Sequence, residues 1–252
     1  MGLDPLYLLF SLPALALSAL FSWRVKAVFS QYSEVRAESG LTGAEAASLM
    51  LSRAGVHDVA IKRASGFLTD HYNPLDNTLN LSDAVYRGHD LSALGVACHE
   101  AGHALQKAQG YKWMGVRSAL VPAANLGSRL SYWVFFAGLA LSAGGQTVDP
   151  YTGETVVTAG ASFGLALVKL GIVLFSAAVA FSVVTLPVEW DASARAKKAL
   201  VAEGLLSPRE ERGAAAVLNA AFMTYIAAAV SSLSTLLYFL VRSGLLGGRR
   251  RR

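Results

Sequence analysis

The sequence is poor in charged residues and in cysteine. Asp, Glu, Lys and Arg make up only 15% of its 252 residues and hydrophobic residues make up 54%, which excludes an ordinary soluble domain. The single cysteine excludes an internal disulfide and a structural zinc site built from several cysteines. The net charge is +5, but basic and aromatic residues do not interleave, so we expect no nucleic-acid partner. What remains is a membrane protein.

Four apolar stretches predict membrane-spanning helices, with the lipid bilayer as their partner. They cover residues 1–23, 119–143, 162–186 and 214–241. The first has no Lys or Arg before its apolar run, which favours an uncleaved anchor, whereas Ala14-Leu15-Ala16 keeps a cleaved signal peptide as the alternative. The second contains Ser128, Arg129 and Ser131, so we expect its first turns to lie at the membrane interface or along a cavity.

The segments between these spans are more polar. We expect a catalytic α+β region over 24–118, an external loop over 144–161, a helix and loop over 187–213 and a basic tail over 242–252. Lys and Arg gather in 24–118 and 187–213, which predicts a multi-pass cell-membrane protein with its catalytic side in the cytoplasm. Four crossings would place the terminal arginines outside, which conflicts with that orientation.

Local patterns predict several short elements within 24–118. We expect helices over 33–38, 44–54, 82–86 and from Asp90 or Ser92 to 108, and strands over 56–61, 66–69 and 78–81. Thr42 and Glu45 form a capping box at the start of the second helix. The strand over 78–81 alternates in polarity, and we expect it to be an exposed edge that pairs with extended substrate.

The chain contains one His-Glu-x-x-His motif, formed by His99, Glu100 and His103. On a helix the two histidines lie one turn apart on one face, where they can hold a single zinc ion. Glu100 stands beside them, where a carboxylate can take a proton from the attacking water. The alternative is a pair of hydrogen-bonded histidines in a core helix. Cys98 points about 100° away from His99 around the helix, so we expect it to pack rather than to bind metal.

A catalytic zinc site needs a third protein ligand. His57, His71 and His89 are candidates, but Glu189 is favoured, because it follows Pro187 at the expected start of an amphipathic helix and its charge needs a partner there. The alternative is a helix N-terminal carboxylate stabilised by the helix dipole.

Other polar residues could support the site. Asp191 lies on another helical face than Glu189, where it could orient a ligand histidine or pair with Arg195 one turn away. Tyr72, His71 and Arg195 are candidates to stabilise an oxyanion, and a turn or packing role for Tyr72 and His71 remains open.

The sequence resembles the neutral zinc metallopeptidases of the bacterial membrane, often called YugP-like. The matching stretches are Asp70 to Pro74, Leu79 to Ser82, His99 to Gln106 and Leu186 to Ser193. The resemblance implies a membrane-bound zincin with kinship to the HtpX and CAAX-processing peptidases. In those relatives an aspartate commonly follows the ligand glutamate by four residues, whereas here Ser193 holds that position, on the face of Glu189, from which it could hydrogen-bond a ligand histidine.

We therefore predict a mainly α integral membrane protein with about four transmembrane helices and a zincin-like α+β unit carrying the motif helix. The predicted function is a zinc metallopeptidase, gluzincin-like, that binds one Zn²⁺ per chain and hydrolyses membrane or membrane-adjacent polypeptides. The alternative is a non-catalytic membrane scaffold with a structural zinc site. A transporter is disfavoured, because no broken helix or paired charge recurs in two halves.

Overall fold

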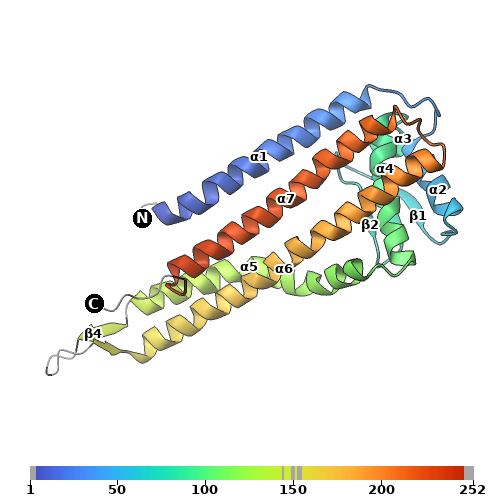
Figure 1. Ribbon diagram of the computed structural model, residues 1–252. Helices are drawn as coiled ribbons and strands as arrows, with labels where there is room; N and C mark the ends of the chain where they lie inside the picture. Colours follow the sequence, from blue (N-terminus) through green and yellow to red (C-terminus); the bar gives the residue numbers. More distant parts are fainter. Residues whose placement is uncertain (1–3, 144, 149–150, 152–154, 247–252) are drawn as a thin grey trace. The chain divides into compact units, whose positions relative to one another are not determined.

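The computed structural model describes residues 4–143, 145–148, 151 and 155–246. Most of them are helical, and the predicted mainly α fold with a small sheet is confirmed (Figure 1). The helices are α1 (Pro5–Ser33), α2 (Gly43–Arg53), α3 (Asp83–Arg87), α4 (Leu91–Ala108), α5 (Lys112–Ala143), α6 (Ala159–Ala202) and α7 (Glu211–Arg242). The strands are β1 (Ala60–Ala64), β2 (His71–Asn73), β3 (Thr78–Ser82), β4 (Gln146–Val148) and β5 (Thr155–Val157).

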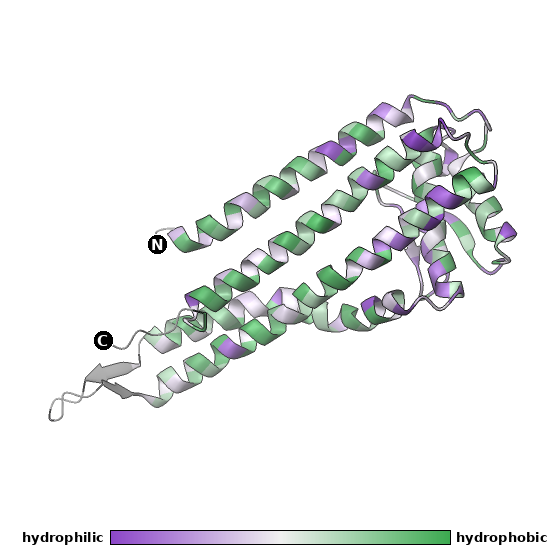
Figure 2. Cartoon of the chain, viewed as in Figure 1, coloured by the Kyte–Doolittle hydropathy of each residue, from purple (hydrophilic) through white to green (hydrophobic). Residues whose placement is uncertain are grey.

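Among the described residues, three helices are long and apolar enough to cross a membrane, namely α1, α6 and α7. Their apolar stretches are visible in Figure 2. Helix α5, which contains the expected span over 119–143, is not one of the three, so the predicted count of four is not confirmed. Arg129 and its neighbouring serines lie in α5 and lower its hydropathy.

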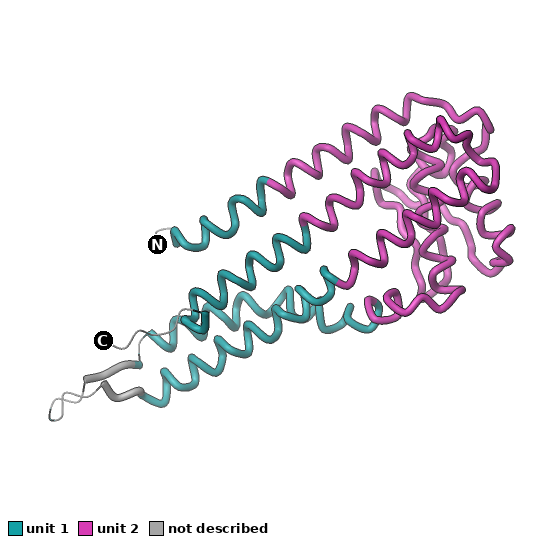
Figure 3. The backbone as a smooth tube through the Cα atoms, in the orientation of Figure 1, with its two compact units in different colours: residues 1–16, 118–183, 228–252 teal, residues 17–117, 184–227 magenta. Residues whose placement is uncertain are grey.

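The chain divides into two compact units (Figure 3). The first comprises 1–16, 118–183 and 228–252 and has an aromatic and aliphatic core. Phe135 and Phe239 stack there with their ring centroids 4.0 Å apart. Glycines let helices α5 and α6 approach closely, since a Cβ on Gly138 would lie 2.7 Å from the carbonyl oxygen of Gly164.

Strands β4 and β5 pair as an antiparallel hairpin in the segment expected to be an external loop. Asp149 and Glu154, on which that expectation depends, lie outside the described residues, as do the four terminal arginines. The side of the membrane on which each segment lies therefore stays a prediction.

The second unit comprises 17–117 and 184–227. Its core is built around α4. Asp90 caps the start of this helix, and its side chain accepts a hydrogen bond from Ala93 N at 2.9 Å. Helix α2 packs against α4, and Thr42 and Glu45 form the predicted capping box at its start. Cys98 is fully buried, as predicted, and burial raises the pKa of its thiol to about 12.

The sheet of the second unit has the order β1-β3-β2. Strand β3 pairs in parallel with β1 and antiparallel with β2, and its residue Leu79 is fully buried. The prediction that the strand over 78–81 is an exposed edge is therefore wrong, because both of its sides are already paired. The edge next to the motif helix is β2.

Three other local predictions need correction. Residues 66–69 are not a strand, because Gly66 and Leu68 have φ angles of 109° and 55°, in the left-handed region. The strand expected over 56–61 starts later, at Ala60. The helix expected over 33–38 does not form, because α1 already extends to Ser33 and the Ala37 N–H donates to the carbonyl of His89 at 2.8 Å.

Helix α6 also differs from the prediction, because it does not begin at Pro187. It is one continuous helix of 44 residues with Pro187 inside it. The short helix α3 does follow Ser82, but the Ser82 hydroxyl donates to Asp70 at 3.0 Å instead of capping the helix.

Candidate metal centre

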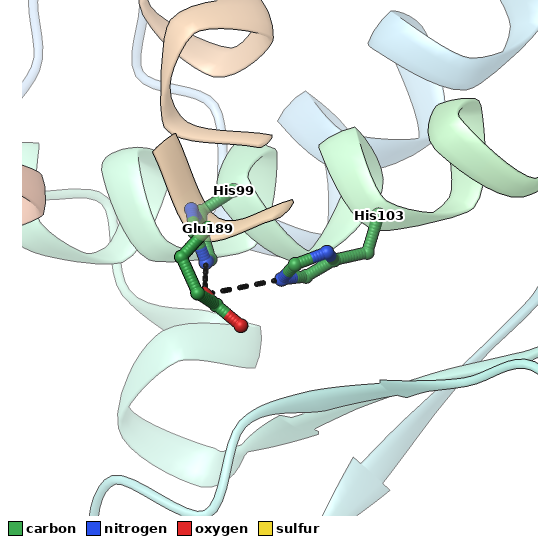
Figure 4. Close-up of side chains that lie close together, drawn as sticks. All are labelled: His99, His103 and Glu189. Carbon is green, nitrogen blue, oxygen red and sulfur yellow. Dashed lines mark hydrogen bonds and ion pairs between the residues drawn. The ribbon is translucent and has the colours of Figure 1, made fainter. Parts of the chain in front are cut away.

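Two histidines of α4 and one glutamate of α6 meet in the second unit (Figure 4). The Nε2 atoms of His99 and His103 lie 3.2 Å and 3.4 Å from the same oxygen, Oε2 of Glu189. The ligand atoms of the three side chains lie within 4.8 Å of one another. The spacing of one helical turn therefore brings both rings to one point, and α6 supplies the carboxylate.

Glu189 lies deep in the protein, with its side chain only 2% exposed. Its other oxygen, Oε1, lies 3.6 Å from Nη2 of Arg117, and Tyr225 of α7 also interacts with its carboxylate. Since α6 begins at Ala159 and Glu189 lies well inside it, the interpretation of Glu189 as a helix N-terminal carboxylate is wrong.

The second nitrogen of His103 is held by Gln106, one turn further along α4. Gln106 is fully buried, and its Nε2 donates to Val188 O and to Asp191 Oδ2, both at 2.8 Å. Its Oε1 is therefore the acceptor at 3.0 Å from His103 Nδ1, which must carry a proton. In the neutral ring, Nε2 of His103 then has a lone pair directed toward Glu189.

The second nitrogen of His99 is held by α6. Nδ1 of His99 hydrogen-bonds with the hydroxyl of Ser193 at 3.1 Å, the contact predicted for this residue. Asp191 forms the predicted ion pair with Arg195, and its contact toward the histidines is with Gln106, from which it accepts a hydrogen bond, rather than with a histidine itself. Arg195 also donates to Gln109 and lies over the ring of Tyr111.

This donor set fits zinc. Two imidazole Nε2 atoms lie 3.2 Å and 3.4 Å from one carboxylate oxygen, and unprotonated all three atoms are acceptors that need a cation between them. Hydrogen bonds on the far side of each ring fix its orientation, as is usual for histidine ligands. In the part of the chain that the structure describes, His57, His71 and His89 do not join the group.

Glu100 lies beside this centre and is held by the sheet. Its Oε2 accepts a hydrogen bond from the backbone N–H of Tyr72 in β2 at 2.8 Å. Glu100, His99 and Tyr225 line a cavity of about 210 Å³. The motif carboxylate therefore lies at the same open space as one of the histidines, where it could reach a bound molecule.

The structure does not bring Tyr72, His71 or Arg195 to this cavity as oxyanion donors. The Tyr72 hydroxyl donates to Asn77, and burial raises its pKa to about 12. His71 is exposed, with Nδ1 at 2.8 Å from Thr69 O. Arg195 is engaged by Asp191 and Gln109.

Three residues of the centre were not expected from the sequence. Gln106 could have been found, because it follows His103 by three residues and shares its helical face. Arg117 and Tyr225 had no such local signal, since they reach Glu189 from other helices.

The chain is similar to known proteins along most of its length. Residues 7–244 match the family described as "Putative neutral zinc metallopeptidase". The chain is similar to the "Putative membrane protease YugP" of Bacillus subtilis (strain 168), with 41% identity over 236 residues, which is 94% of this chain and 96% of that protein. No solved structure matches.

Proposed function

Because the chain belongs to the neutral zinc metallopeptidase family, we propose that it is a membrane-embedded zinc endopeptidase of polypeptides in or next to the bilayer. The observation that carries the proposal is the convergence of His99, His103 and Glu189 beside the carboxylate of Glu100. A purely structural site would not need this carboxylate at an adjoining cavity.

In this proposal His99, His103 and Glu189 hold one zinc ion. Zinc held there would polarise the scissile carbonyl and lower the pKa of a water molecule. Ser193 and Gln106 keep the two imidazoles oriented through their Nδ1 atoms. Asp191 and Arg195 fix the amide of Gln106 from its other side.

Glu100 is the general base and then the general acid. Its carboxylate takes a proton from the attacking water and passes it to the leaving amine as the peptide C–N bond breaks. The Tyr72 N–H occupies Oε2 of Glu100, so this hydrogen bond anchors the side chain to the edge strand.

The decisive experiment compares Glu100→Gln with the wild-type chain, purified in detergent micelles with zinc. We expect the variant to keep one zinc per chain, measured by inductively coupled plasma mass spectrometry. We expect its hydrolysis of an unfolded casein substrate to fall about 100-fold or more, because general-base catalysis is lost.

Glu34→Gln makes the same chemical change at an exposed residue and should leave zinc content and hydrolysis unchanged. Equal hydrolysis by wild type and Glu100→Gln would reject the peptidase proposal and would favour a structural metal site.

A further inference from the structure

Polar and apolar side chains line the cavity that contains His99 and Glu100, and we refer to the two sets as its polar wall and its apolar wall. The polar wall also includes Asp70, Thr224 and Tyr225. The apolar wall comes from α1, α4, α7 and the turn before β2. Its larger side chains are Val25, Phe29, Leu68, Val96, Val217 and Leu218.

The size of this cavity limits what it can accept. Its volume of about 210 Å³ is smaller than that of typical small-molecule sites, which are roughly 300–1,000 Å³. It therefore suits a single side chain of a longer molecule. Phe29, Val217 and Leu218 are buried, so the apolar wall is set in a packed core rather than in a loop.

The charged groups of the cavity already have partners. Asp70 accepts hydrogen bonds from Ser82 N at 2.7 Å and from the Ser82 hydroxyl at 3.0 Å. Glu100 accepts one from Tyr72 N. An acidic side chain would be repelled by both carboxylates, and a basic side chain would have to leave water for a cavity lined largely by apolar residues.

We propose that this cavity is the specificity pocket and takes one bulky apolar side chain, of the size of Leu or Phe, from the residue next to the scissile bond. The inference rests on the proposed peptidase function, and it adds the class of peptide that the site selects. A side chain seated against Val217 and Leu218 would hold the peptide backbone beside His99 and Glu100, because these four residues share one cavity.

The test uses internally quenched peptides that differ at one position, which carries Leu, Phe, Ala, Asp or Lys. With the zinc-loaded full chain in detergent, we expect kcat/KM for the Leu or Phe peptide to exceed that for the Ala peptide at least 10-fold, and Asp and Lys peptides to be poorer still. Mass spectrometry of the products should place cleavage next to the varied residue.

Ala221 lines the same cavity from α7, and Ala221→Phe should fill it. We expect this variant to lose at least 10-fold in kcat/KM on the Leu and Phe peptides and less than 2-fold on the Ala peptide. Ala228→Phe adds the same ring at an exposed position of α7 and should leave kcat/KM unchanged on all of these peptides. If Ala221→Phe fails to fold, Val217→Ala serves instead, since a larger pocket should shift preference from Leu toward Phe.

A binding measurement separates this inference from the peptidase proposal. Glu100→Gln should bind the fluorescent Leu peptide at least 10-fold more tightly than the Ala peptide, whether or not the wild type cleaves them. The specificity-pocket inference would be wrong if all peptides bound equally, or if Ala221→Phe lowered kcat/KM equally on all peptides. Neither result would contradict the peptidase proposal. If the Leu peptide bound selectively but the wild type hydrolysed no peptide, the peptidase proposal would be wrong and the apolar pocket would be supported.

Discussion

Nδ1 of His103 lies 3.0 Å from Oε1 of Gln106, and this contact fixes which ring nitrogen faces Glu189. Gln106 is itself held by Val188 and Asp191, so His103 of α4 is oriented through the backbone and a side chain of α6. The geometry of the candidate metal centre therefore depends on how α4 and α6 pack against each other.

Gln106→Met keeps the length of the side chain but removes the acceptor for His103. We expect the zinc dissociation constant to rise about 10- to 100-fold, as is typical when a group that orients a ligand is lost. Competition with a chromophoric chelator measures it. Gln31→Met, at an exposed position of α1, is the control. An unchanged dissociation constant would show that Gln106 does not orient His103.

Glu189→Gln keeps the shape of the third ligand but removes its charge. We expect the purified variant to contain less than 0.1 zinc per chain, because a neutral amide is a poor zinc ligand and its NH₂ group would face the histidines or Arg117. Substitution of His57, His71 or His89 by Ala should leave one zinc per chain. A full complement of zinc in Glu189→Gln would exclude Glu189 as a ligand.

Asp70→Asn should make stability less dependent on pH. Burial raises the pKa of Asp70 above its ordinary value, against the opposing hydrogen bonds from Ser82, so the folded chain holds this proton more tightly than the unfolded chain. Stability from this group therefore falls as pH rises through the folded-state pKa, and the buried charge is unfavourable at pH 7.

The variant should consequently unfold at a higher temperature than the wild type at pH 7, and the difference should shrink toward pH 4. Differential scanning fluorimetry across this range measures it, with Glu34→Gln as a variant that should follow the wild type. A constant difference at every pH would mean that the Asp70 charge is not responsible.

Gly102→Ala should loosen α4 from α6. A Cβ at Gly102 would lie 2.6 Å from the carbonyl oxygen of Ala192, so the backbones must move apart. We expect a loss of about 1–3 kcal/mol in the free energy of unfolding, typical of overpacking, and weaker zinc binding. Gly115→Ala, with no atom within 4 Å of the added Cβ, should instead stabilise α5 by about 0.5–1 kcal/mol.

The part of the centre that lies on α4 was accessible from the sequence. His99, Glu100 and His103 form a local pattern whose helical spacing fixes their common face, and Asp90 marks the start of the helix. The family resemblance, which rests on this motif and three other stretches, is confirmed by the comparisons. Ser193 was found because it lies one turn after Glu189.

Three local features that the sequence did not predict depend on tertiary contacts. Pro187 is typical of a helix start, yet α6 continues through it, as helices can when surrounding packing compensates for one missing N–H donor. Leu68 in the left-handed region could not be expected from a Phe-Leu-Thr run. Strand β3 has the alternation of an edge strand but is covered on both sides by partners from different parts of the chain.

The distance along the chain between His99 and Glu189, 90 residues, has a consequence for biosynthesis. A nascent chain that ends after α5 already contains both histidines and Glu100 but lacks the third ligand and Ser193. Such a chain cannot assemble the three-ligand zinc site. Hydrolysis by the proposed peptidase can therefore begin only after α6 has been made.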